Sequence, residues 1–347
     1  MNLKQLAENL GLSQTTVSRA LNGYPEVSEA TRRRVVDAAE LHNYRPNARA
    51  KGLATGQAMA IGHVIPIDDK HEMVNPIFGD FLAGAGETYS SLGYEMVLSV
   101  VEPGDEATVY RTMRARGSVD GVVVSAPRVS DGRLDLLDRL KMPYVVHGRV
   151  SEHEGDYSWL DVNNRSAFQR ATNFLLDLGH RRIALINGLE EMDFAWRRRR
   201  GYERAMEERG LSTEPGLMVA NEMTERNGYL TASQMLSRDA PPTAFLVSSL
   251  ICALGVRRAI EERGLSMNRD VSVVTHDDAL SYIDNGLDVP IFTATRSSVR
   301  EAGRRTARML IDRIDNPDLP HVHQLLEAQL VVGQSTGPFT ASQGLKA

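Results

Sequence analysis

The sequence has little of what marks secreted, membrane-bound or disulfide-stabilised proteins. Its 347 residues include one cysteine, Cys252, which excludes an internal disulfide framework. No apolar run approaches the roughly 20 residues that a membrane-spanning helix needs. The first residues, MNLKQLAENLGLSQ, lack the charged and then apolar layout of a signal peptide. We therefore expect a cytoplasmic protein that has no contact with a membrane.

Short motifs of the common α/β enzymes are also missing. There is no GxGxxG or Walker-type phosphate loop, and the nine histidines show no metal-ligand spacing. The His321-Val322-His323 run is more typical of a strand edge than of a metal site, and His180 in LGHRR is interpreted as structural. We expect no catalytic residues, no metal and no cofactor. An enzyme on a doubly wound fold remains the less favoured alternative.

Length and charge divide the chain into a basic head and an acidic body. With 347 residues the chain is too long for one compact core and suits two or three units. The net charge of the whole chain is −5, but residues 1–58 carry eight basic and five acidic side chains. The head is therefore +3 and the remainder −8. This asymmetry is expected where one end of a protein meets nucleic acid phosphates.

The first 46 residues have the pattern of three short helices. Apolar residues within 3–10 recur at i, i+3, i+4 and i+7, and Gly11 can then end that helix. Ser13 is placed to cap a second helix that runs to about Leu21, and Ser28 is placed to cap a third. Three short helices with a tight turn between the first two indicate a helix-turn-helix.

The outer face of the second helix carries polar side chains that can bind bases or phosphates. Taken alone, such a face is more often simply solvated. The terminal position, the positive charge and the linker that follows favour DNA, and Arg19 suits a bidentate contact with guanine. The linker, residues 47–57, is too short to form a stable helix alone, so we expect it to order only against a partner surface.

After residue 58, short β-rich runs alternate with amphipathic segments. Strands are expected at 59–65, 96–101, 121–125, 144–147, 183–186, 244–247 and 271–274, and helices at 78–92, 166–178, 200–209, 228–236 and 254–263. This alternation indicates parallel sheets that are covered on both faces. The expected fold is an α/β body of two doubly wound lobes behind an all-α head, with domains at 1–46, 47–57 and 58–338.

The residues that follow Met1 carry a specific resemblance. The run LKQLAENLGLSQTTVSRALNGYPEVSEATRRRVVDAAELHNYRPNARAKGLATG resembles the DNA-binding head of the LacI/GalR family throughout. The likeness continues through LGHRRIA (178–184), RGY (200–202), DVSVV (270–274) and QLVV (329–332). It implies a dimeric bacterial transcription repressor with a periplasmic-binding-protein-like sensor. The N-lobe would comprise about 58–158 and 295–318, and the C-lobe about 159–291 and 320–336.

The resemblance also implies how the head meets operator DNA. Residues 14–22 would enter the major groove, and 47–55 would become a hinge helix in the minor groove. Leu53 would wedge into the central base step and kink the duplex; packing against the protein body is the alternative for this residue. The DNA-binding residues implied are Gln14, Thr15, Thr16, Ser18, Arg19, Asn22, Arg49, Ala50 and Leu53.

For the body, the resemblance implies a small sugar effector between the lobes. Arg198 and Asp277 would hold vicinal hydroxyls while an aromatic ring covers the apolar sugar face. Trp196 is a candidate platform, although ordinary packing is as good an interpretation of it. The expected ligand-binding residues are Asn75, Phe78, Asp193, Trp196, Arg198, Ser249 and Asp277.

Three departures from the family pattern bear on the ligand. Ser249 stands where most members have an asparagine, Gly148 replaces an aspartate, and Gly333-Gln334 replaces Arg-Glu. We expect a neutral mono- or disaccharide with α-linked glucose, because the chain also resembles rhizobial regulators of α-glucoside use. A regulator that responds to a non-sugar metabolite is the main alternative. A sugar-binding protein without a DNA role fits poorly with the basic head.

Overall fold

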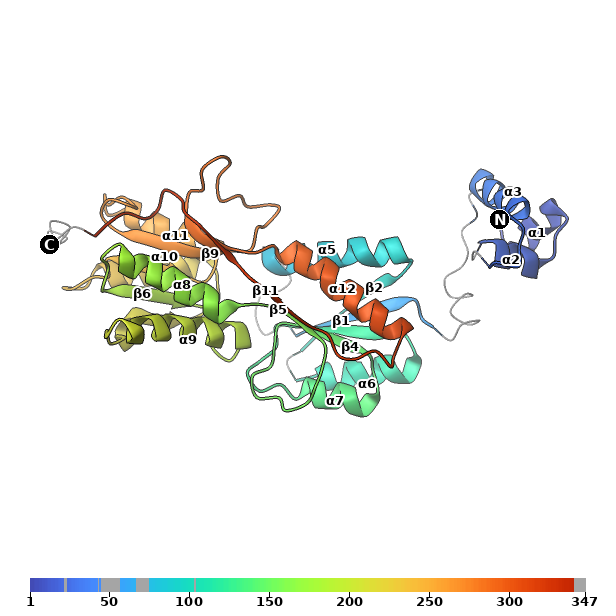
Figure 1. The fold of residues 1–347 in the computed structure, drawn as a ribbon, viewed down its shortest axis with the longest axis horizontal. Helices are drawn as coiled ribbons and strands as arrows, with labels where there is room; N and C mark the ends of the chain where they lie inside the picture. Colours follow the sequence, from blue (N-terminus) through green and yellow to red (C-terminus); the bar gives the residue numbers. More distant parts are fainter. Residues whose placement is uncertain (22–23, 43, 45–56, 67–74, 103, 340–347) are drawn as a thin grey trace. The chain divides into compact units, whose positions relative to one another are not determined.

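The computed structural model describes residues 1–21, 24–42, 44, 57–66, 75–102 and 104–339. The chain forms two compact units, Met1–Ala60 with Gly117–Asp120, and Ile61–Arg116 with Gly121–Ala347. Figure 1 labels the elements of each unit. The predicted hinge helix at 47–55 lies outside the described residues, as do the four predicted DNA-binding residues Asn22, Arg49, Ala50 and Leu53.

The first unit contains the three helices that the sequence predicts, α1 (Leu3–Leu10), α2 (Gln14–Leu21) and α3 (Glu29–Leu41). Gly11 ends α1 in the left-handed conformation at φ 64°. The Ser13 hydroxyl accepts from the Thr16 N–H at 3.0 Å, which caps α2, and Ser28 caps α3 in the same way. The helices share a small apolar core of Leu6, Ala7, Val17, Ala20, Val35 and Ala39.

The second unit begins with a six-stranded sheet in the order β11-β5-β4-β3-β1-β2. Helices α5 (Pro76–Leu92) and α12 (Val299–Asp315) pack together against this sheet, and α6 (Glu106–Arg116) pairs with α7 (Arg133–Leu140). The strands are β1 (Ala60–Pro66), β2 (Glu95–Val101), β3 (Gly121–Ser125), β4 (Tyr144–His147), β5 (Trp159–Val162) and β11 (His323–Leu326).

A second six-stranded sheet follows in the order β12-β10-β9-β8-β6-β7. Its helices pair as α8 (Asn164–Asp177) with α9 (Asp193–Glu208), and α10 (Glu225–Leu236) with α11 (Leu250–Glu261). The strands are β6 (Ile183–Asn187), β7 (Met218–Ala220), β8 (Ala244–Val247), β9 (Ser272–Asp277), β10 (Thr293–Arg296) and β12 (Gln329–Val331). A short 3₁₀ helix, Pro215–Leu217, precedes β7.

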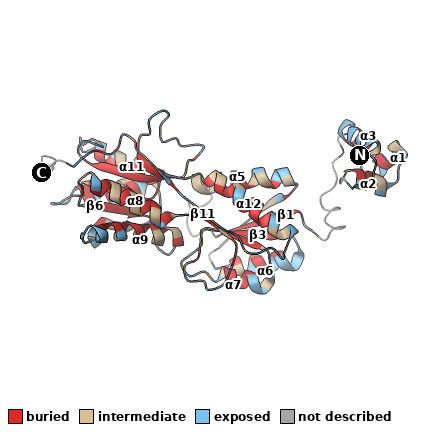
Figure 2. Cartoon of the chain, viewed as in Figure 1, coloured by how far each residue is buried: buried red, intermediate tan, exposed pale blue. Residues whose placement is uncertain are grey.

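Strand β6 shows how this sheet is covered on both faces. Ile183 and Leu185 belong to the core beneath α8 and α9, whereas Ala184 and Ile186 belong to the core beneath α10 and α11. Successive strand side chains point to opposite faces, so a strand buried on both sides has no polar alternation. Figure 2 shows the buried residues gathered on the sheets. Among the described helices, none combines the length and apolar character that a membrane crossing requires.

The strand pairing corrects the expected lobe limits. Strands β5 and β11 pair in parallel with each other, and β5 also pairs with β4, so both lie in the first sheet. The sequence limits assigned both strands to the C-lobe, because each short strand directly precedes a point where the chain crosses over. The end of β10 also differs from the expected limits. Residues 295–296 were expected in the N-lobe, but β10 lies in the second sheet beside β9. Strand β12 runs antiparallel to β10, an exception to the expected parallel order.

Two glycines of α5 give a matched test of the packing between α5 and α12. A Cβ on Gly84 would lie 1.9 Å from the Arg300 carbonyl oxygen, whereas a Cβ on Gly79 would meet nothing within 4 Å. Gly84→Ala should therefore force the two helices apart and destabilise the body by about 1–3 kcal/mol. Gly79→Ala should be neutral, or stabilising by roughly 0.5–1 kcal/mol, because alanine favours the helix. Thermal unfolding of both variants measures the difference, and equal melting temperatures would contradict the close packing.

Candidate functional site

The outer face of α2 presents polar side chains to solvent. Gln14, Thr15 and Arg19 are exposed, while Thr16 and Ser18 are partly buried. With 100° per residue, Gln14, Ser18, Thr15 and Arg19 fall within an arc of about 140°. Thr16 lies outside this arc, and its hydroxyl is 2.8 Å from that of Ser13. The exposed face therefore consists of hydrogen-bonding groups on the side opposite the helix core.

The arginines of α3 have a different role from Arg19. Arg32 donates to the Tyr24 carbonyl at 2.9 Å, and Arg34 donates to the Leu10 carbonyl at 3.0 Å. These contacts hold the turns of the head together. Among the described residues, the side chain of Arg19 makes no hydrogen bond or ion pair. Its guanidinium is thus available to an external partner.

In the second unit, a cavity of about 200 Å³ lies between residues of both sheets. The carboxyl ends of the strands supply Ser125 from β3, His147 from β4, Asp161 from β5, and Asp278 directly after β9. The starts of α5, α8, α9 and α12 supply further parts of its wall. Ligands of open parallel α/β sheets bind at the carboxyl ends of the strands, so the cavity has the position of a ligand site.

Arg198 of α9 is the buried cation of this cavity. Its Nε donates to the Asn164 side-chain oxygen at 2.8 Å, and its Nη1 donates to the Ser248 carbonyl at 2.6 Å. The Phe194 ring lies 4.9 Å from its guanidinium carbon. Burial lowers the pKa of Arg198 to about 10, so the group is still charged near neutral pH. These contacts fix a positive, planar donor group in the wall of the cavity.

Asp278 is the partly buried anion of the same cavity. Its Oδ1 lies 3.4 Å from Nε2 of His276. Burial acts to raise the pKa of Asp278, but His276 and Arg198 outweigh it and the pKa is lowered. The cavity therefore holds a carboxylate acceptor as well as a guanidinium donor. This pairing suits a ligand that carries neighbouring hydroxyl groups.

The comparisons with known proteins agree with this architecture. Residues 2–47 match the bacterial regulatory proteins of the lacI family, and residues 172–336 match the periplasmic binding protein-like domain. The HTH-type transcriptional regulator AglR of Rhizobium meliloti (strain 1021) is 47% identical over 345 residues, covering 97% of this chain and 95% of that protein. The chain belongs to the lacI family. It is a helix-turn-helix transcription regulator with a periplasmic-binding-protein-like sensor fold.

Two solved structures of the family resemble most of the chain. The transcriptional regulator CelR in complex with cellobiose is 28% identical with a TM-score of 0.71, covering 96% of this chain and 99% of that chain. The lac repressor dimer bound to operator and the anti-inducer ONPF is 26% identical with a TM-score of 0.78, covering 97% and 99%. The likeness thus extends over the head and both lobes.

The sequence prediction placed the cavity carboxylate one residue too early. Asp277 does not line the cavity; its Oδ1 accepts from the Ala279 N–H at 2.8 Å, and its Oδ2 lies 3.5 Å from Nε of Arg296. Neighbouring side chains on an extended segment point in opposite directions. Asp277 at the end of β9 therefore holds the following turn, and Asp278 enters the cavity.

Of the other predicted ligand residues in the family site, two line the cavity besides Arg198. Asn75 does so while its side chain caps α5, accepting from the Ile77 N–H at 3.1 Å, and Phe78 follows on the same helix. Both lie at the start of α5, where the side chains of the first turn reach the carboxyl ends of the strands. The residues of the Asn-Pro-Ile-Phe pattern thus line the cavity, and their role in ligand binding stays a prediction.

The remaining three predicted ligand residues lie away from the cavity lining. Asp193 is buried and accepts from the Ser151 N–H at 2.9 Å. Trp196 lies under the guanidinium of Arg200, whose central carbon is 5.3 Å from the ring centroid. Ser249 caps α11 by accepting from the Ile251 N–H at 3.1 Å. On α9, Phe194 and Arg198 lie on the face that turns to the cavity. Trp196 lies between them in sequence but on the opposite face of the helix, so its ring does not line the cavity.

Sequence reasoning missed several polar residues that the structure brings to the cavity. Asp161 pairs with Arg149 at 2.8 Å; burial raises the pKa of Asp161 although Arg149 acts to lower it. Asn164 orients Arg198, and His147 lines the wall at the end of β4. The available signal was position, because each follows or ends a short apolar strand. That rule would have found all three residues.

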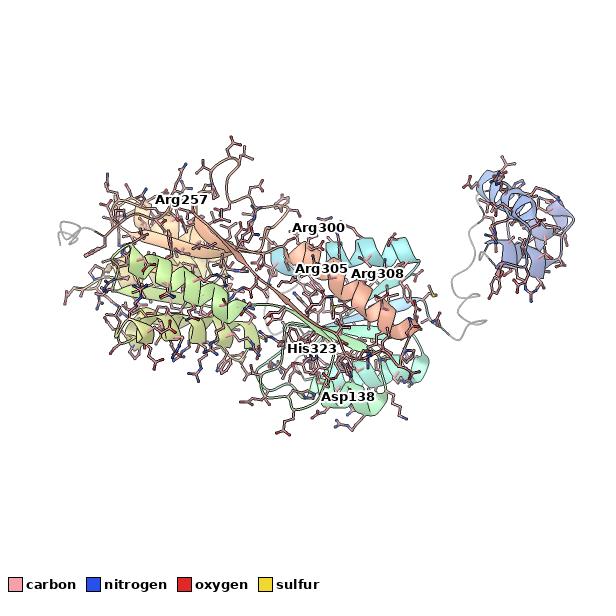
Figure 3. All side chains as sticks on the ribbon, in the orientation of Figure 1. Asp138, Arg257, Arg300, Arg305, Arg308 and His323 are labelled. Carbon is pink, nitrogen blue, oxygen red and sulfur yellow. The ribbon has the colours of Figure 1, made fainter. Side chains whose placement is uncertain are left out.

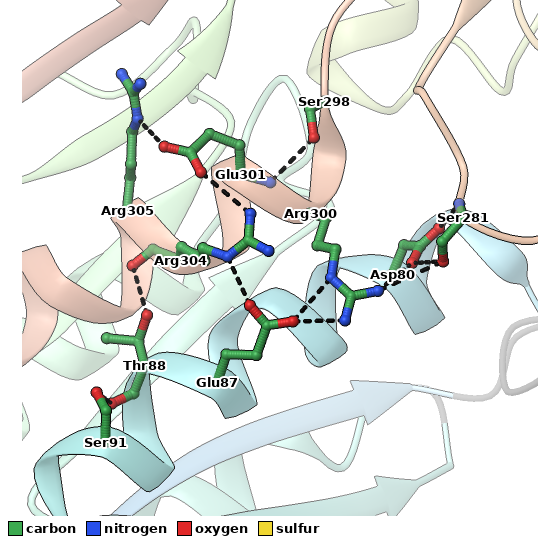
Figure 4. A network of polar contacts seen from close by, with 10 residues as sticks. All are labelled: Asp80, Glu87, Thr88, Ser91, Ser281, Ser298, Arg300, Glu301, Arg304 and Arg305. Carbon is green, nitrogen blue, oxygen red and sulfur yellow. Dashed lines mark hydrogen bonds and ion pairs between the residues drawn. The ribbon is translucent and has the colours of Figure 1, made fainter.

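A polar network joins the two lobes beside the cavity. Arg300, Arg305 and Arg308 follow one another along α12 (Figure 3). In Figure 4, Asp80 of α5 accepts from both the N–H and the hydroxyl of Ser281, with the N–H at 2.7 Å. Nη1 of Arg300 lies 3.4 Å from the same carboxylate. Ser281 comes three residues after Asp278, so this network attaches the segment that carries the cavity carboxylate to α5.

A second interlobe contact involves the first turns of α9. The Asp193 N–H donates to the Pro127 carbonyl at 3.0 Å, and Nη2 of Arg197 donates to the Ser151 hydroxyl at 2.8 Å. Pro127 and Ser151 follow strands of the first sheet, whereas Asp193 and Arg197 lie on a helix of the second. The lobes are therefore connected through polar contacts that water can replace when the lobes move apart.

Asp80→Asn should loosen the network of Figure 4. The amide keeps the shape of the carboxylate but brings donors toward the hydroxyl of Ser281 and toward Arg300, and a hydrogen bond to a charged group contributes about 1.5–3 kcal/mol. Amide hydrogen exchange at Ser281 should therefore rise about tenfold or more. Glu87→Gln is the control, because it removes the more exposed partner of Arg300. Equal exchange rates in the two variants would contradict the role of Asp80 in holding the Ser281 segment against α5.

Proposed function

We propose that this chain is a repressor that binds a two-fold operator as a homodimer and releases it when a neutral sugar binds between the lobes. The observation that carries the proposal is that the buried Arg198 and the partly buried Asp278 line one cavity of the sensor. A guanidinium and a carboxylate together present donors and acceptors to adjacent hydroxyls. The sensor-fold relative CelR, whose solved structure is a complex with cellobiose, supports a sugar as the ligand class.

The size and extension of the cavity favour a ligand of two rings. A second cavity of about 330 Å³ shares Asn75, Ala126, Phe194 and Met223 with the first. A ligand that fills both spaces would have one ring beside Arg198 and Asp278 and another beside the start of α10. We therefore propose a disaccharide, with α-linked glucose as the first choice to test.

Two exposed apolar surfaces support the proposed homodimer. Leu98 and Val100 are exposed on β2, which is an edge strand of the first sheet. In the loop after β9, Tyr282 and Leu287 are 91% and 92% exposed. Apolar side chains on an edge strand and at a loop tip are costly to leave in water. A second copy would cover them, and the similar lac repressor structure is a dimer on its operator.

Control of DNA binding follows from coupling between the two sites. A ligand shifts the lobe arrangement only as far as it prefers one arrangement over the other. In the proposed dimer, lobe movement would change the spacing of the two linkers at 47–57. The predicted hinge segment with Leu53 at the operator centre would then lose its place, and the repressor would leave the DNA.

Base reading by α2 can be tested at Arg19 with two variants. Arg19→Ala should weaken operator binding by about 1–3 kcal/mol and relax the preference at one base pair per half-site. Arg19→Lys keeps the charge but loses the bidentate fork, so it should keep binding to random DNA and still lose the preference. Affinities for operator and random duplexes at fixed salt measure both effects. An unchanged ratio in either variant would exclude base reading by Arg19.

The carboxylate assignment can be tested with adjacent residues. Asp278→Asn should weaken the sugar about tenfold or more, since a hydrogen bond to a charged group contributes about 1.5–3 kcal/mol. Asp277→Asn is the matched control and should leave the affinity within about threefold, because that side chain holds a turn. Calorimetry with maltose, trehalose, sucrose and cellobiose, after a thermal-shift screen, provides the measurement. A larger loss in the control would restore Asp277 as the ligand residue.

A further inference from the structure

We propose that His147 binds the effector directly and sets the selectivity of the cavity for one ligand hydroxyl. This inference rests on the proposed function, because it deepens the ligand chemistry of the same cavity. His147 ends β4 and lines the cavity from the first lobe, whereas Asp278 lines it from the second. Nothing in the sequence marks this residue beyond its place at the end of an expected strand.

Stacking orients the imidazole of His147, but its nitrogens make no hydrogen bond to the described residues. Its ring stacks on Phe81 with the centroids 4.2 Å apart and the planes inclined by 19°. Among the described residues, neither ring nitrogen has a hydrogen-bond partner. Polar groups that a protein withdraws from bulk water are normally hydrogen-bonded. An oriented imidazole with idle nitrogens beside a cavity therefore points to a ligand.

Three other histidines of the second unit make the contrast clear. His63 is 3.1 Å from the Tyr89 hydroxyl, and His276 is 3.0 Å from the Thr295 hydroxyl. His180 contacts the Thr243 and Ser272 side chains at 3.0 and 2.9 Å. Each of these imidazoles has a partner within the fold. His276 also lines the cavity, but its second nitrogen, Nε2, lies 3.3 Å from the Ser297 hydroxyl and 3.4 Å from Asp278. Of the two histidines in the cavity wall, His147 is therefore the one whose nitrogens have no partner among the described residues.

Gly148 explains why a histidine serves at this strand end. Its φ of +114° is unfavourable for any side chain, and a Cβ there would lie 2.7 Å from Cγ of Pro127. The aspartate that the family resemblance leads one to expect at this position has no room. The polar group of this strand end must then come from its neighbour. His147 supplies it, and the ligand chemistry changes with it.

The electrostatics favour a neutral ligand. Burial lowers the pKa of His147 to about 4, although the charge of Asp278 acts in the opposite direction. The ring is therefore neutral near pH 7 and offers one donor and one acceptor. A neutral imidazole adds no countercharge to that of Arg198 for a ligand carboxylate or phosphate, and Asp278 would repel such a group. A hydroxyl between His147 and Asp278 would instead connect the two lobes and favour their closed arrangement.

The experiment compares wild type with His147→Phe and His147→Gln by calorimetry with the best of maltose, trehalose, sucrose and cellobiose. Phenylalanine keeps the stacking on Phe81 and removes both nitrogens, so the affinity should fall about tenfold or more. Glutamine restores a donor and an acceptor and should recover part of the loss. His323→Phe is the matched control. His323, which Figure 3 labels, begins β11 and also stacks on an aromatic ring, Trp159. It is not among the residues that line the cavity. Operator binding without sugar should be unchanged in all variants, which shows that they fold.

A set of monodeoxy analogues of the same sugar separates contact from structural support. Wild type should lose affinity when the hydroxyl that meets His147 is removed, and His147→Phe should not distinguish that analogue from the full sugar. A structural role would weaken all analogues alike. Wild-type affinity in His147→Phe, or such a uniform loss, would overturn the inference and leave the proposed function standing. Failure of wild type to bind any of these sugars would overturn the proposed function and the inference with it.

Discussion

The functional geometry depends on the direction of the parallel strands. In each lobe the central strands run the same way, so the polar residues that end them meet at one edge of the sheet. Both edges face the same cavity, which receives His147 and Asp161 from one lobe and Asp278 from the other. A residue reaches the cavity because of where its strand ends, almost independently of its distance along the chain. The crossings near residues 163, 297 and 327 allow the chain to build both edges.

This arrangement concentrates charge in a place from which water is largely withdrawn. A buried guanidinium is costly unless opposite charges and acceptors surround it. Arg198 has the Asn164 oxygen and the Ser248 carbonyl as acceptors, and Asp278 as a nearby counter-charge. The cavity is thus nearly balanced before any ligand arrives. A neutral ligand with hydroxyls preserves that balance, whereas a charged ligand would disturb it.

The same segments that form the cavity also hold the lobes together. Asp278 leads within three residues to Ser281, which Asp80 holds, and Arg198 follows directly on Arg197, which donates to Ser151. Ligand contact and interlobe contact are therefore neighbours in sequence on both sides of the cavity. Because these residues are adjacent, a ligand that moves Arg198 or Asp278 would directly change the neighbouring contacts between the lobes. Coupling between ligand binding and the lobe arrangement therefore does not require a chain of contacts through the core.

The sequence by itself determined the features that depend on local pattern. The three helices of the head follow from apolar spacing and from Ser13 and Ser28 as caps, and most strands of the body were located from their β-rich runs. Motif likeness also indicated the family, and it singled out Asn75 and Phe78, which line the cavity. These signals are local because helix caps, periodicity and short motifs act within a few residues.

Only the tertiary structure decided which side chains meet. Whether Asp277 or Asp278 enters the cavity depends on a reversal of direction between adjacent residues after β9, which the motif does not encode. Trp196 lies on the outer side of α9 because the face with Arg198 is taken by the cavity, and β5 and β11 join the first sheet through pairing across the chain. His147 emerged as a candidate only from its stacking on Phe81 and from the lack of room for a side chain at Gly148. Each of these outcomes is set by contacts between residues far apart in sequence, where composition and spacing carry no information about direction.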